Sequence, residues 1–426
     1  MRLVFVNRFF HPDHSATSQI LTDLCFALAA RGHEVHVVTS RLRYDDASLA
    51  LPANETASGV AVHRVWTSRF GRGALPGRAM DYLTFYLSAL ARLARLADRN
   101  TILVAKTDPP MISVVAALAA RATGARLVNW TQDLFPEVAV AVGMRMMRPL
   151  IARWLAVVRD WSLACAARNV VIGEQMRARL LARGLPHSKI AVIHNWADGA
   201  VIAPGPRVTE TVGAPAEGTE ANPLRREWGL DGKFVVGYSG NLGRAHEFAT
   251  LLDAAGKLAH REDGEDGEDG EDIVFLFIGG GHQLGALKAE AGRRGLANLQ
   301  FRPYQPRERL AQSLGACDAH LVTLRAGLEG LVLPSKFYGI IAAARPVLYV
   351  GAGEGEIPEL VRAAECGAVF AVGDAAALAD CIRRMAADRS VASRWGANGR
   401  RLFDERFAMP IAIDRWERLL ADVAQG

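Results

Sequence analysis

The residues best suited to chemistry lie between Glu329 and Val350, a stretch whose pattern predicts a loop, a helix, a tight turn and a buried strand. Pro334 suits the first position of that helix, and Ser335 and Lys336 follow it. Unpaired backbone N–H groups and one cation would therefore converge where a phosphate could bind. An ordinary capped helix after a core strand is the alternative explanation.

A carboxylate precedes this predicted helix. Glu329 can accept hydrogen bonds from hydroxyl groups, and the missing Cβ atom of Gly330 would let a ligand approach the backbone. With Leu331, these residues predict that a sugar binds beside the phosphate.

A second loop follows the strand-like run Phe234–Tyr238 and opens a helix. Its chemically useful residues are Ser239, Gly240, Asn241, Gly243, Arg244 and His246. The glycines give the backbone freedom to surround a phosphate, and Arg244 could hold that phosphate bidentately. The alternative is a plain strand-to-helix turn with Arg244 in solvent.

The run Gly279-Gly280-Gly281 also follows an apolar strand, but it departs from the dinucleotide fingerprint. Its next glycine, Gly285, is one position late, and the following strand Leu299–Arg302 ends in a base rather than an acid. This pattern does not favour NAD; it favours tight packing and close approach of Gly280 to a nucleotide. Tyr304 follows the next strand and could meet a base or a ribose, although a capped helix starting at Pro306 explains it equally well.

The first half of the chain offers carboxylates and a polar loop. Asp133 and Glu137 come just after a strand, where Asp133 could act as a base or bind a sugar hydroxyl; capping of a helix is the alternative. His14, Ser15 and Thr17 belong to a loop with the small, polar residues that a phosphate-facing turn needs. A third metal ligand is missing near His14, so no metal site is predicted.

These residues need a scaffold, and the chain predicts two α/β domains. Strand-like runs alternate with helical patterns throughout, which is typical of parallel sheets covered on both faces. At 426 residues the chain exceeds what one core fills. The predicted divisions are a first domain over 1–200, a second over 201–409, and a C-terminal helix over 410–426 that packs back toward the first domain.

Composition limits the environment and the partners. Five scattered cysteines indicate neither a zinc site nor disulfides. No apolar run is long enough to cross a bilayer, and no signal peptide is evident, so we expect a cytoplasmic protein. Eight acids in the repeat at 261–272 hide a basic body, because without them the net charge rises from +5 to +13. Such a charge favours anionic partners.

The whole chain resembles the family 4 glycosyltransferases, which are retaining enzymes of the GT-B fold. The similarity is closest to the subgroup that builds bacterial colanic acid, O-antigen and capsule, including fucosyl and N-acetylfucosaminyl transferases. Sequence markers in both halves carry it: Leu28–Val35, Gln132–Glu137, Ile193–Trp196, Tyr238–His246 and Leu333–Lys336.

The resemblance implies two Rossmann-like doubly wound domains facing a central cleft. It further implies transfer of a hexose, with retention, from a UDP- or GDP-sugar to a lipid-linked saccharide, without a cofactor, a metal or a nucleic acid partner. A nucleotide-sugar epimerase of the same fold and a catalytically silent partner subunit remain alternatives.

The resemblance also assigns roles, with departures. The family often has two glutamates separated by seven residues; Glu329 matches the first, but the second falls on Phe337 or Gly339, so its ribose contact is absent or supplied elsewhere. The usual Arg and Lys on the diphosphate align with Asn241 and His246, so Arg244 and Lys336 are expected to carry that charge. A histidine frequent in the first domain has no clear counterpart, and we assign its role to Asp133.

Two stretches mix large apolar residues with arginines, at 78–99 and 144–168. In the second, Trp154 and Trp161 occur among Arg145, Arg148 and Arg153, a composition typical of helices that lie on a membrane surface. The sequence therefore predicts docking on the anionic inner face of the cytoplasmic membrane. An apolar stripe packed against the protein's own sheet is the alternative.

Overall fold

The computed structural model describes residues 1–13, 15–43, 50–71, 75–144, 147–204, 222–259 and 273–426. The predicted residues His14 and Arg145 and the acidic repeat lie outside these ranges. The chain forms two compact units. Unit 1 comprises Met1–Asn195, Gly330–Leu333 and Pro410–Gly426, and unit 2 comprises Trp196–Glu329 and Pro334–Met409.

Unit 1 contains an eight-stranded sheet in the order β3-β4-β2-β1-β5-β6-β7-β8. Every neighbouring pair is parallel except the edge pair β3 and β4. The strands are β1 (Arg2–Val6), β2 (Glu34–Ser40), β3 (Asn54–Ala57), β4 (Val60–Val65), β5 (Thr101–Lys106), β6 (Arg126–Thr131), β7 (Arg168–Val171) and β8 (Ile190–Val192). The order reverses between β1 and β5, and ligands of doubly wound sheets bind at such a point.

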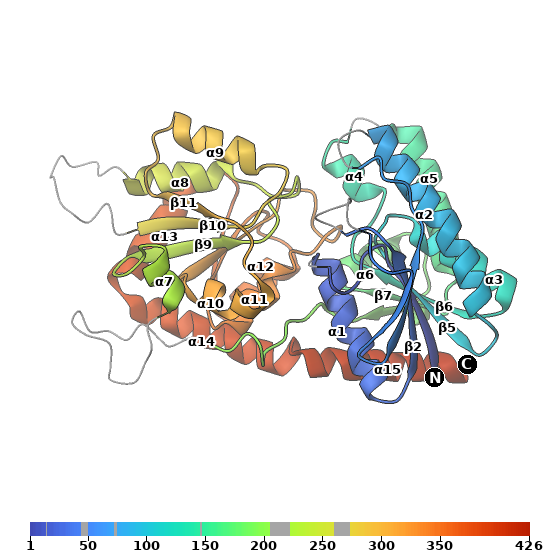
Figure 1. The fold of residues 1–426 in the computed structure, drawn as a ribbon. Helices are drawn as coiled ribbons and strands as arrows, with labels where there is room; N and C mark the ends of the chain where they lie inside the picture. Colours follow the sequence, from blue (N-terminus) through green and yellow to red (C-terminus); the bar gives the residue numbers. More distant parts are fainter. Residues whose placement is uncertain (14, 44–49, 72–74, 145–146, 205–221, 260–272) are drawn as a thin grey trace. The chain divides into compact units, whose positions relative to one another are not determined.

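Helices cover both faces of this sheet (Figure 1). They are α1 (Ala16–Ala30), α2 (Leu75–Leu96), α3 (Ile112–Thr123), α4 (Glu137–Ala141), α5 (Pro149–Cys165), α6 (Glu174–Ala182), the short η1 (His187–Lys189) and α15 (Met409–Gln425). The helix α1 starts at Ala16, and a left-handed Gly32 follows its end. Burial on both faces explains why the strands are continuous apolar runs.

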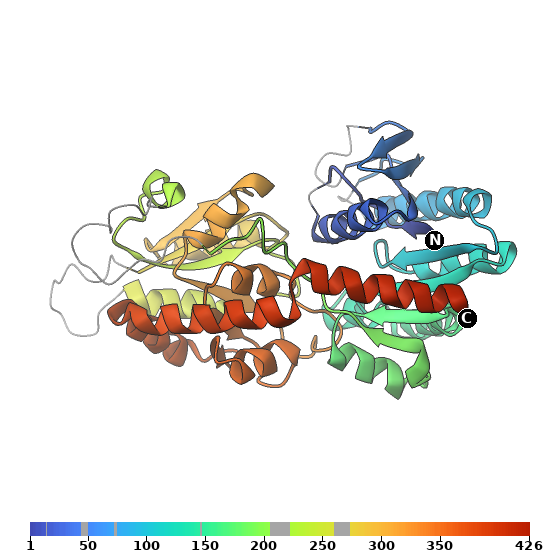
Figure 2. The ribbon, with the colours of Figure 1, turned by 90° about the horizontal axis from the view of Figure 1, so that it is seen from below.

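The C-terminal helix α15 lies along unit 1 (Figure 2). The Trp416 ring is fully buried, with its centroid 4.6 Å from that of Trp130 on β6. Arg31 forms ion pairs with Asp414 and Glu417 at 2.7 and 2.6 Å. These contacts make α15 part of the core of unit 1.

Unit 2 contains a parallel six-stranded sheet in the order β11-β10-β9-β12-β13-β14, which reverses between β9 and β12. The strands are β9 (Phe234–Ser239), β10 (Ile273–Ile278), β11 (Leu299–Arg302), β12 (Ala319–Thr323), β13 (Val347–Val350) and β14 (Gly367–Phe370). The helices are α7 (Pro223–Glu227), α8 (Ala249–Ala259), α9 (Leu284–Arg293), η3 (Arg307–Arg309), α10 (Leu310–Gly315), α11 (Lys336–Ala342), α12 (Glu356–Ala363), α13 (Ala375–Ala387) and α14 (Arg389–Arg406).

Two predicted helix starts are wrong by a short distance. The helix α11 begins at Lys336, with Ser335 as its N-cap, so Pro334 precedes the helix rather than occupying its first position. The segment after Pro306 is first a short 3-10 turn, η3, and becomes α-helical only at Leu310. The predicted doubly wound architecture itself is confirmed.

Close packing of α14 against the turn before β13 generates a stability prediction. A Cβ atom on Gly396 would lie 2.1 Å from the Ala344 carbonyl oxygen, so Gly396→Ala must push α14 off the sheet. We expect a loss of roughly 1–3 kcal/mol in the free energy of unfolding, measured by chemical denaturation.

The matched control is Gly292→Ala in α9, where an added Cβ atom meets nothing within 4 Å. Alanine lowers the entropy of the unfolded chain, so this variant should be unchanged or slightly more stable. Equal stability of the two variants would contradict the packing described for α14.

Candidate active site

Two glycine loops interlock at the carboxyl ends of β9 and β10. The N–H groups of Gly240 and Leu242 donate to the carbonyl oxygens of Ile278 and Gly280 at 2.9 and 2.7 Å. Gly281 has a φ of +133°, and a Cβ atom there would lie 2.3 Å from the Asn241 Oδ1 atom. The close approach that the glycines permit is therefore, first of all, the approach of one loop to the other.

Gln283, which the sequence analysis missed, fixes this pair of loops. Its Nε2 atom donates to the carbonyl oxygens of Gly243 and His246 at 2.5 and 3.3 Å. Its backbone N–H donates to the carbonyl oxygen of Leu242. A glutamine after the third glycine was the available signal, but its partners lie about forty residues earlier in the chain.

Lys336 brings an ammonium group to the end of β9. Its Nζ atom donates to the Tyr238 hydroxyl at 2.5 Å and lies 3.8 Å from the centre of that ring. No carboxylate forms an ion pair with Lys336 among the described residues. Surrounding protein atoms desolvate the ammonium group and lower its pKa to about 7. An uncompensated cation of this kind marks a place for an anion.

Gly240 leaves room beside this cation, because a Cβ atom there would touch the Lys336 Cε atom at 3.5 Å. His246 lies on the other side of Tyr238, with ring centroids 5.7 Å apart. The His246 Nδ1–H donates to the Thr323 carbonyl oxygen at 2.8 Å. Burial, and then the charge of Lys336, lower the pKa of His246 to about 3, so the ring is neutral. The loop thus contributes the neutral His246 ring, and α11 contributes Lys336 as the cationic group beside it.

Arg244 is exposed on the same loop and contacts His282 at 3.1 Å through its Nη2 atom. Arg325, at the end of β12, reaches this loop: its backbone N–H donates to the Ala245 carbonyl at 2.9 Å. Two arginines therefore flank the carboxyl ends of β9 and β12. The strand ends in the sequence also predict that the loops at Ser239 and Arg325 face one crevice, although no role is assigned to Arg325 there.

Tyr304 packs against the second glycine loop. Cβ atoms on Gly279 and Gly280 would lie 3.2 and 3.1 Å from its ring, which remains 57% exposed. An exposed ring over a glycine loop can support a flat ligand. The predicted position of Tyr304 near a base is compatible with this geometry and stays a prediction.

Glu329 lies close to the carboxyl end of the same sheet. Its Oε2 atom accepts the Gly327 N–H at 2.8 Å, and its Cγ atom would contact a Cβ atom on Gly355 at 3.5 Å. Burial, and then the charge of Glu329, raise the pKa of Tyr349 at the end of β13. The carboxylate is held by this turn, so its position does not depend on a ligand.

Gly330 and Leu331 belong to unit 1, although they were predicted with the donor site of the second domain. The Leu331 carbonyl accepts the Leu134 N–H at 2.9 Å, and a Cβ atom on Gly330 would lie 2.9 Å from the Arg179 Nε atom. This short segment therefore contacts the loop that carries Asp133.

The two acids after β6 have different surroundings. Glu137 forms ion pairs with Arg159 and Arg183 at 2.7 and 3.4 Å, so its role is structural. Asp133 precedes α4 by four residues and caps nothing, and no hydrogen bond to its side chain occurs in the described parts of the chain. Desolvation, and then the like charge of Asp108, raise the pKa of Asp133; the side chain stays exposed, and solvent limits the rise.

The polar loop before α1 caps that helix. The Ser15 Oγ atom accepts the Ser18 N–H at 3.3 Å. Thr17 lies in the first turn of α1 rather than in the loop, and its Oγ1 donates to Asp108 at 3.3 Å. The buried Lys106 ammonium donates to the Thr17 carbonyl at 2.9 Å and lies over the Trp130 ring. Ser15 and Thr17 thus have structural partners at the strand-order reversal of unit 1. No cluster of three potential metal ligands occurs within the described ranges, and the expectation of metal-free chemistry stays a prediction.

Known families match both halves of the chain. Residues 16–196 match a glycosyl transferase 4-like domain, and residues 221–402 match glycosyl transferases group 1. The probable glycosyltransferase WbjE of Pseudomonas aeruginosa is 29% identical over 308 residues, which cover 72% of this chain and 70% of WbjE. The putative colanic acid biosynthesis glycosyl transferase WcaI of Escherichia coli K12 is 24% identical over 364 residues, covering 80% and 81%.

Solved structures share the fold. HepE of Anabaena, crystallised with UDP and glucose, superposes with a TM-score of 0.72 at 15% identity, over 99% of this chain and 100% of HepE. WaaG, a glycosyltransferase involved in lipopolysaccharide biosynthesis, gives 0.67 at 14% identity, over the full length of both chains.

Two parallel Rossmann-like sheets and two matched domains define a glycosyltransferase of the GT-B fold. Both halves of the chain match glycosyltransferase domains, and the chain is a nucleotide-sugar glycosyltransferase. The finer fucosyl subgroup stays a prediction.

Lys336 generates a prediction for nucleotide binding. Lys336→Ala should weaken UDP or GDP binding roughly 10- to 150-fold in calorimetry, because a charge-assisted hydrogen bond contributes about 1.5–3 kcal/mol. A bound diphosphate raises the pKa of Lys336 above its value of about 7 in the free protein. The contribution of Lys336 to affinity should therefore be complete below about pH 7 and fall by up to about tenfold per unit as pH rises toward 9.

Lys336→Arg is the matched control, because arginine stays charged throughout this range. It should abolish the pH dependence while binding more tightly than Lys336→Ala at pH 9. Unchanged affinity in Lys336→Ala would remove Lys336 from the diphosphate site.

Proposed function

We propose that this enzyme transfers a sugar, with retention at the anomeric carbon, from a UDP- or GDP-sugar to a lipid-linked saccharide in bacterial surface polysaccharide biosynthesis. The observation that carries the donor half of the proposal is the uncompensated Lys336 ammonium beside Gly240. The name of WcaI, a putative colanic acid biosynthesis glycosyl transferase, supports the pathway class. Retention and the lipid-linked acceptor rest on the family resemblance.

In this proposal unit 2 binds the donor. The leaving diphosphate lies at Lys336 and the loop from Ser239 to His246, with Arg244 and Arg325 neutralising its outer oxygens. Tyr304 and Gly280 lie where a base could stack. Charge that develops on the leaving diphosphate is stabilised by groups that are already in position, and no metal is required.

The sugar and acceptor are assigned to two carboxylates. Glu329, which its own turn holds in place, accepts hydrogen bonds from donor sugar hydroxyls. Asp133 orients or deprotonates the acceptor hydroxyl, a role that its raised pKa favours because a more basic carboxylate is a better proton acceptor.

Incubation with labelled UDP- and GDP-sugars in the absence of acceptor tests the proposed reaction. The expected result is slow hydrolysis of one donor, unaffected by a metal chelator, and transfer when a lipid-linked saccharide is added. Conversion of the donor to another nucleotide sugar would show an epimerase. No reaction with any donor or acceptor would show a silent subunit.

Glu329→Gln separates sugar binding from diphosphate binding. Because the partner of Glu329 is the sugar, turnover should fall by about tenfold or more while the affinity for free UDP or GDP stays within about twofold. Steady-state kinetics and calorimetry provide the two values. Near-normal turnover would take Glu329 out of the site.

The acceptor brings a membrane into the proposal. The helix α5 turns its apolar side chains outward: Leu150, Trp154 and Val157 are 78%, 64% and 66% exposed, and with Trp161 they form one stripe. Arg159 lies on the inner side of the helix, where it is buried in ion pairs with Glu137 and Asp160 at 2.7 Å. The exposed stripe therefore does not pack against the protein's own sheet, which was the alternative from the sequence.

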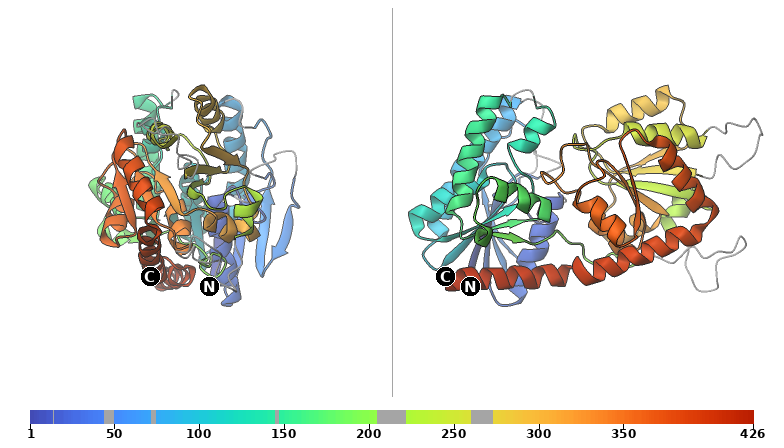
Figure 3. Two further views of the ribbon diagram at one scale, coloured as in Figure 1. Left: turned by 90° about the vertical axis from the view of Figure 1, so that its left-hand side faces the viewer. Right: turned by 180° about the vertical axis from the view of Figure 1, so that it is seen from behind.

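Neighbouring helices extend this apolar surface. The helix α3 packs against both α2 and α5 (Figure 3). The exposed apolar residues are Met80, Leu83 and Leu87 on α2 and Leu118 on α3. Arg148 and Arg153 are exposed beside the stripe on α5. No helix in the described ranges is long and apolar enough to span a membrane. We propose that these helices lie on an anionic bilayer surface.

Liposome flotation tests this surface. Binding to anionic vesicles should exceed binding to neutral ones and should weaken as salt rises, since each arginine near an anionic leaflet contributes about 1 kcal/mol. The double variant Arg148→Glu/Arg153→Glu should lose binding. Arg415→Glu/Arg418→Glu on α15, with the same charge change, should retain it.

Trp154→Ser should also weaken flotation, since it removes apolar area without changing charge. If neither lipid binds at low salt, and light scattering shows a dimer that Trp154→Ser dissociates, the stripe is a subunit interface and the docking proposal is wrong.

A further inference from the structure

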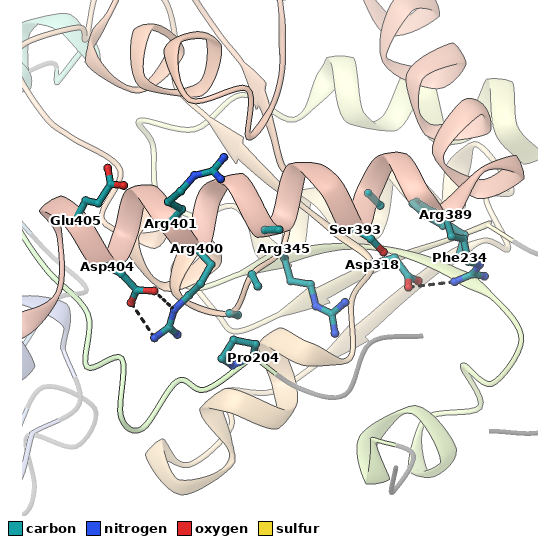
Figure 4. Close-up of a pocket in the computed structure, with 14 residues that line it drawn as sticks. Pro204, Phe234, Asp318, Arg345, Arg389, Ser393, Arg400, Arg401, Asp404 and Glu405 are labelled. Carbon is teal, nitrogen blue, oxygen red and sulfur yellow. Dashed lines mark hydrogen bonds and ion pairs between the residues drawn. The ribbon is translucent and has the colours of Figure 1, made fainter. Parts of the chain in front are cut away.

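A cavity of about 500 Å³ opens at the edge of the unit 2 sheet opposite the glycine loops. It is bounded by Phe234 at the start of β9, Asp318 before β12, the turn Ala343–Arg345 before β13, and one face of α14. Figure 4 shows these residues around the cavity. Ligands of doubly wound sheets bind at the carboxyl ends of the strands, so this cavity is separate from the donor site.

Four arginines line this cavity: Arg345, Arg389, Arg400 and Arg401. Two have carboxylate partners, because Arg389 pairs with Asp318 at 3.1 Å and Arg400 pairs with Asp404 at 2.9 Å. Asp318 is shared further with Arg225, also at 3.1 Å. Glu405 also lines the cavity, so the lining carries four guanidinium groups and three carboxylates.

Of the four lining arginines, Arg345 and Arg401 form no ion pair within the described part of the chain. Arg345 donates from Nη2 to the Gly315 carbonyl at 2.8 Å, while its buried Nε–H has no hydrogen-bond partner. Arg401 donates to Asn398 Oδ1 at 2.7 Å and is otherwise exposed. A guanidinium group does not lose its charge in proteins, so a buried N–H that it leaves unpaired is costly.

The remaining lining suits an organic body rather than an ion alone. Ala343, Ala392, Ala397 and the Phe234 ring supply apolar surface, and Ser393 supplies a hydroxyl. The volume is that of a site for a small molecule. Guanidinium groups match phosphate oxygens in geometry and charge.

We propose that this cavity binds a small phosphorylated metabolite of the size of a sugar phosphate, with its phosphate on Arg345 and with the exposed Arg401 at the rim of the cavity. The proposal is independent of the donor site. One feature joins the two places: α11 begins at Lys336 and runs directly into Ala343–Arg345. The effect of a ligand in this cavity on the affinity for a nucleotide can therefore be measured.

Calorimetry with glucose 1-phosphate, inorganic phosphate and glucose tests the site. The full chain carrying Lys336→Ala is used, so that the donor site does not compete. We expect one equivalent of glucose 1-phosphate to bind, inorganic phosphate to bind more weakly, and glucose not to bind. If glucose 1-phosphate binds to the native protein but not to the Lys336→Ala variant, the ligand lies in the donor site and the proposal is overturned.

Variants locate the site. Arg401→Glu is exposed and should fold normally, and it should weaken glucose 1-phosphate binding by about tenfold or more. Arg345→Met should do the same, and Ala397→Phe should block binding by filling the cavity. Arg394→Met, an exposed arginine on α14 that does not line the cavity, should have no effect.

Two further outcomes would overturn the proposal. One is the absence of binding by either phosphate at millimolar concentration. The other is binding to phosphatidylglycerol vesicles, abolished by Arg401→Glu, without binding of soluble phosphates, which would assign these arginines to a lipid headgroup.

Discussion

The proposed donor site depends on one contact, in which the Lys336 ammonium group lies against the Tyr238 phenol. Within the described residues, no carboxylate pairs with this ammonium group. Lys336 comes from the start of α11 and Tyr238 from the end of β9, so their contact ties two elements at the strand-order reversal of unit 2. A cation in such a place lowers the stability of the empty site and favours any state in which an anion is bound. The glycine loops have the complementary property: they place backbone close to the cation without side chains in the way.

Much of this arrangement could be predicted from the sequence. Alternating apolar runs and helical patterns predict two doubly wound sheets, and the carboxyl ends of their strands then predict which loops share a site. Lys336, Gly240 and Glu329 follow from residue type and position alone. The edge strand β3 and the short β14 could not be predicted in this way, because neither has a long apolar run.

Residues that act through distant partners were not predictable. Gln283 acquires its role only when β10 is placed beside β9. For α5, periodicity identifies an apolar stripe but does not indicate which way it faces. The decisive fact is the position of Glu137, which pairs with Arg159 and so holds the Arg159 side of the helix inward. Helix α11 begins later than expected because Pro334 and Ser335 form the turn before it.

The central claim is that nucleotides bind at the carboxyl ends of β9 and β10 in unit 2. Hydrogen–deuterium exchange of the full chain, with and without UDP and GDP, tests it most directly. One of the two nucleotides should slow exchange of the backbone amides at 239–247 and 279–283 and at the start of α11. Protection confined to loops of unit 1, with none at these amides in unit 2, would contradict the account.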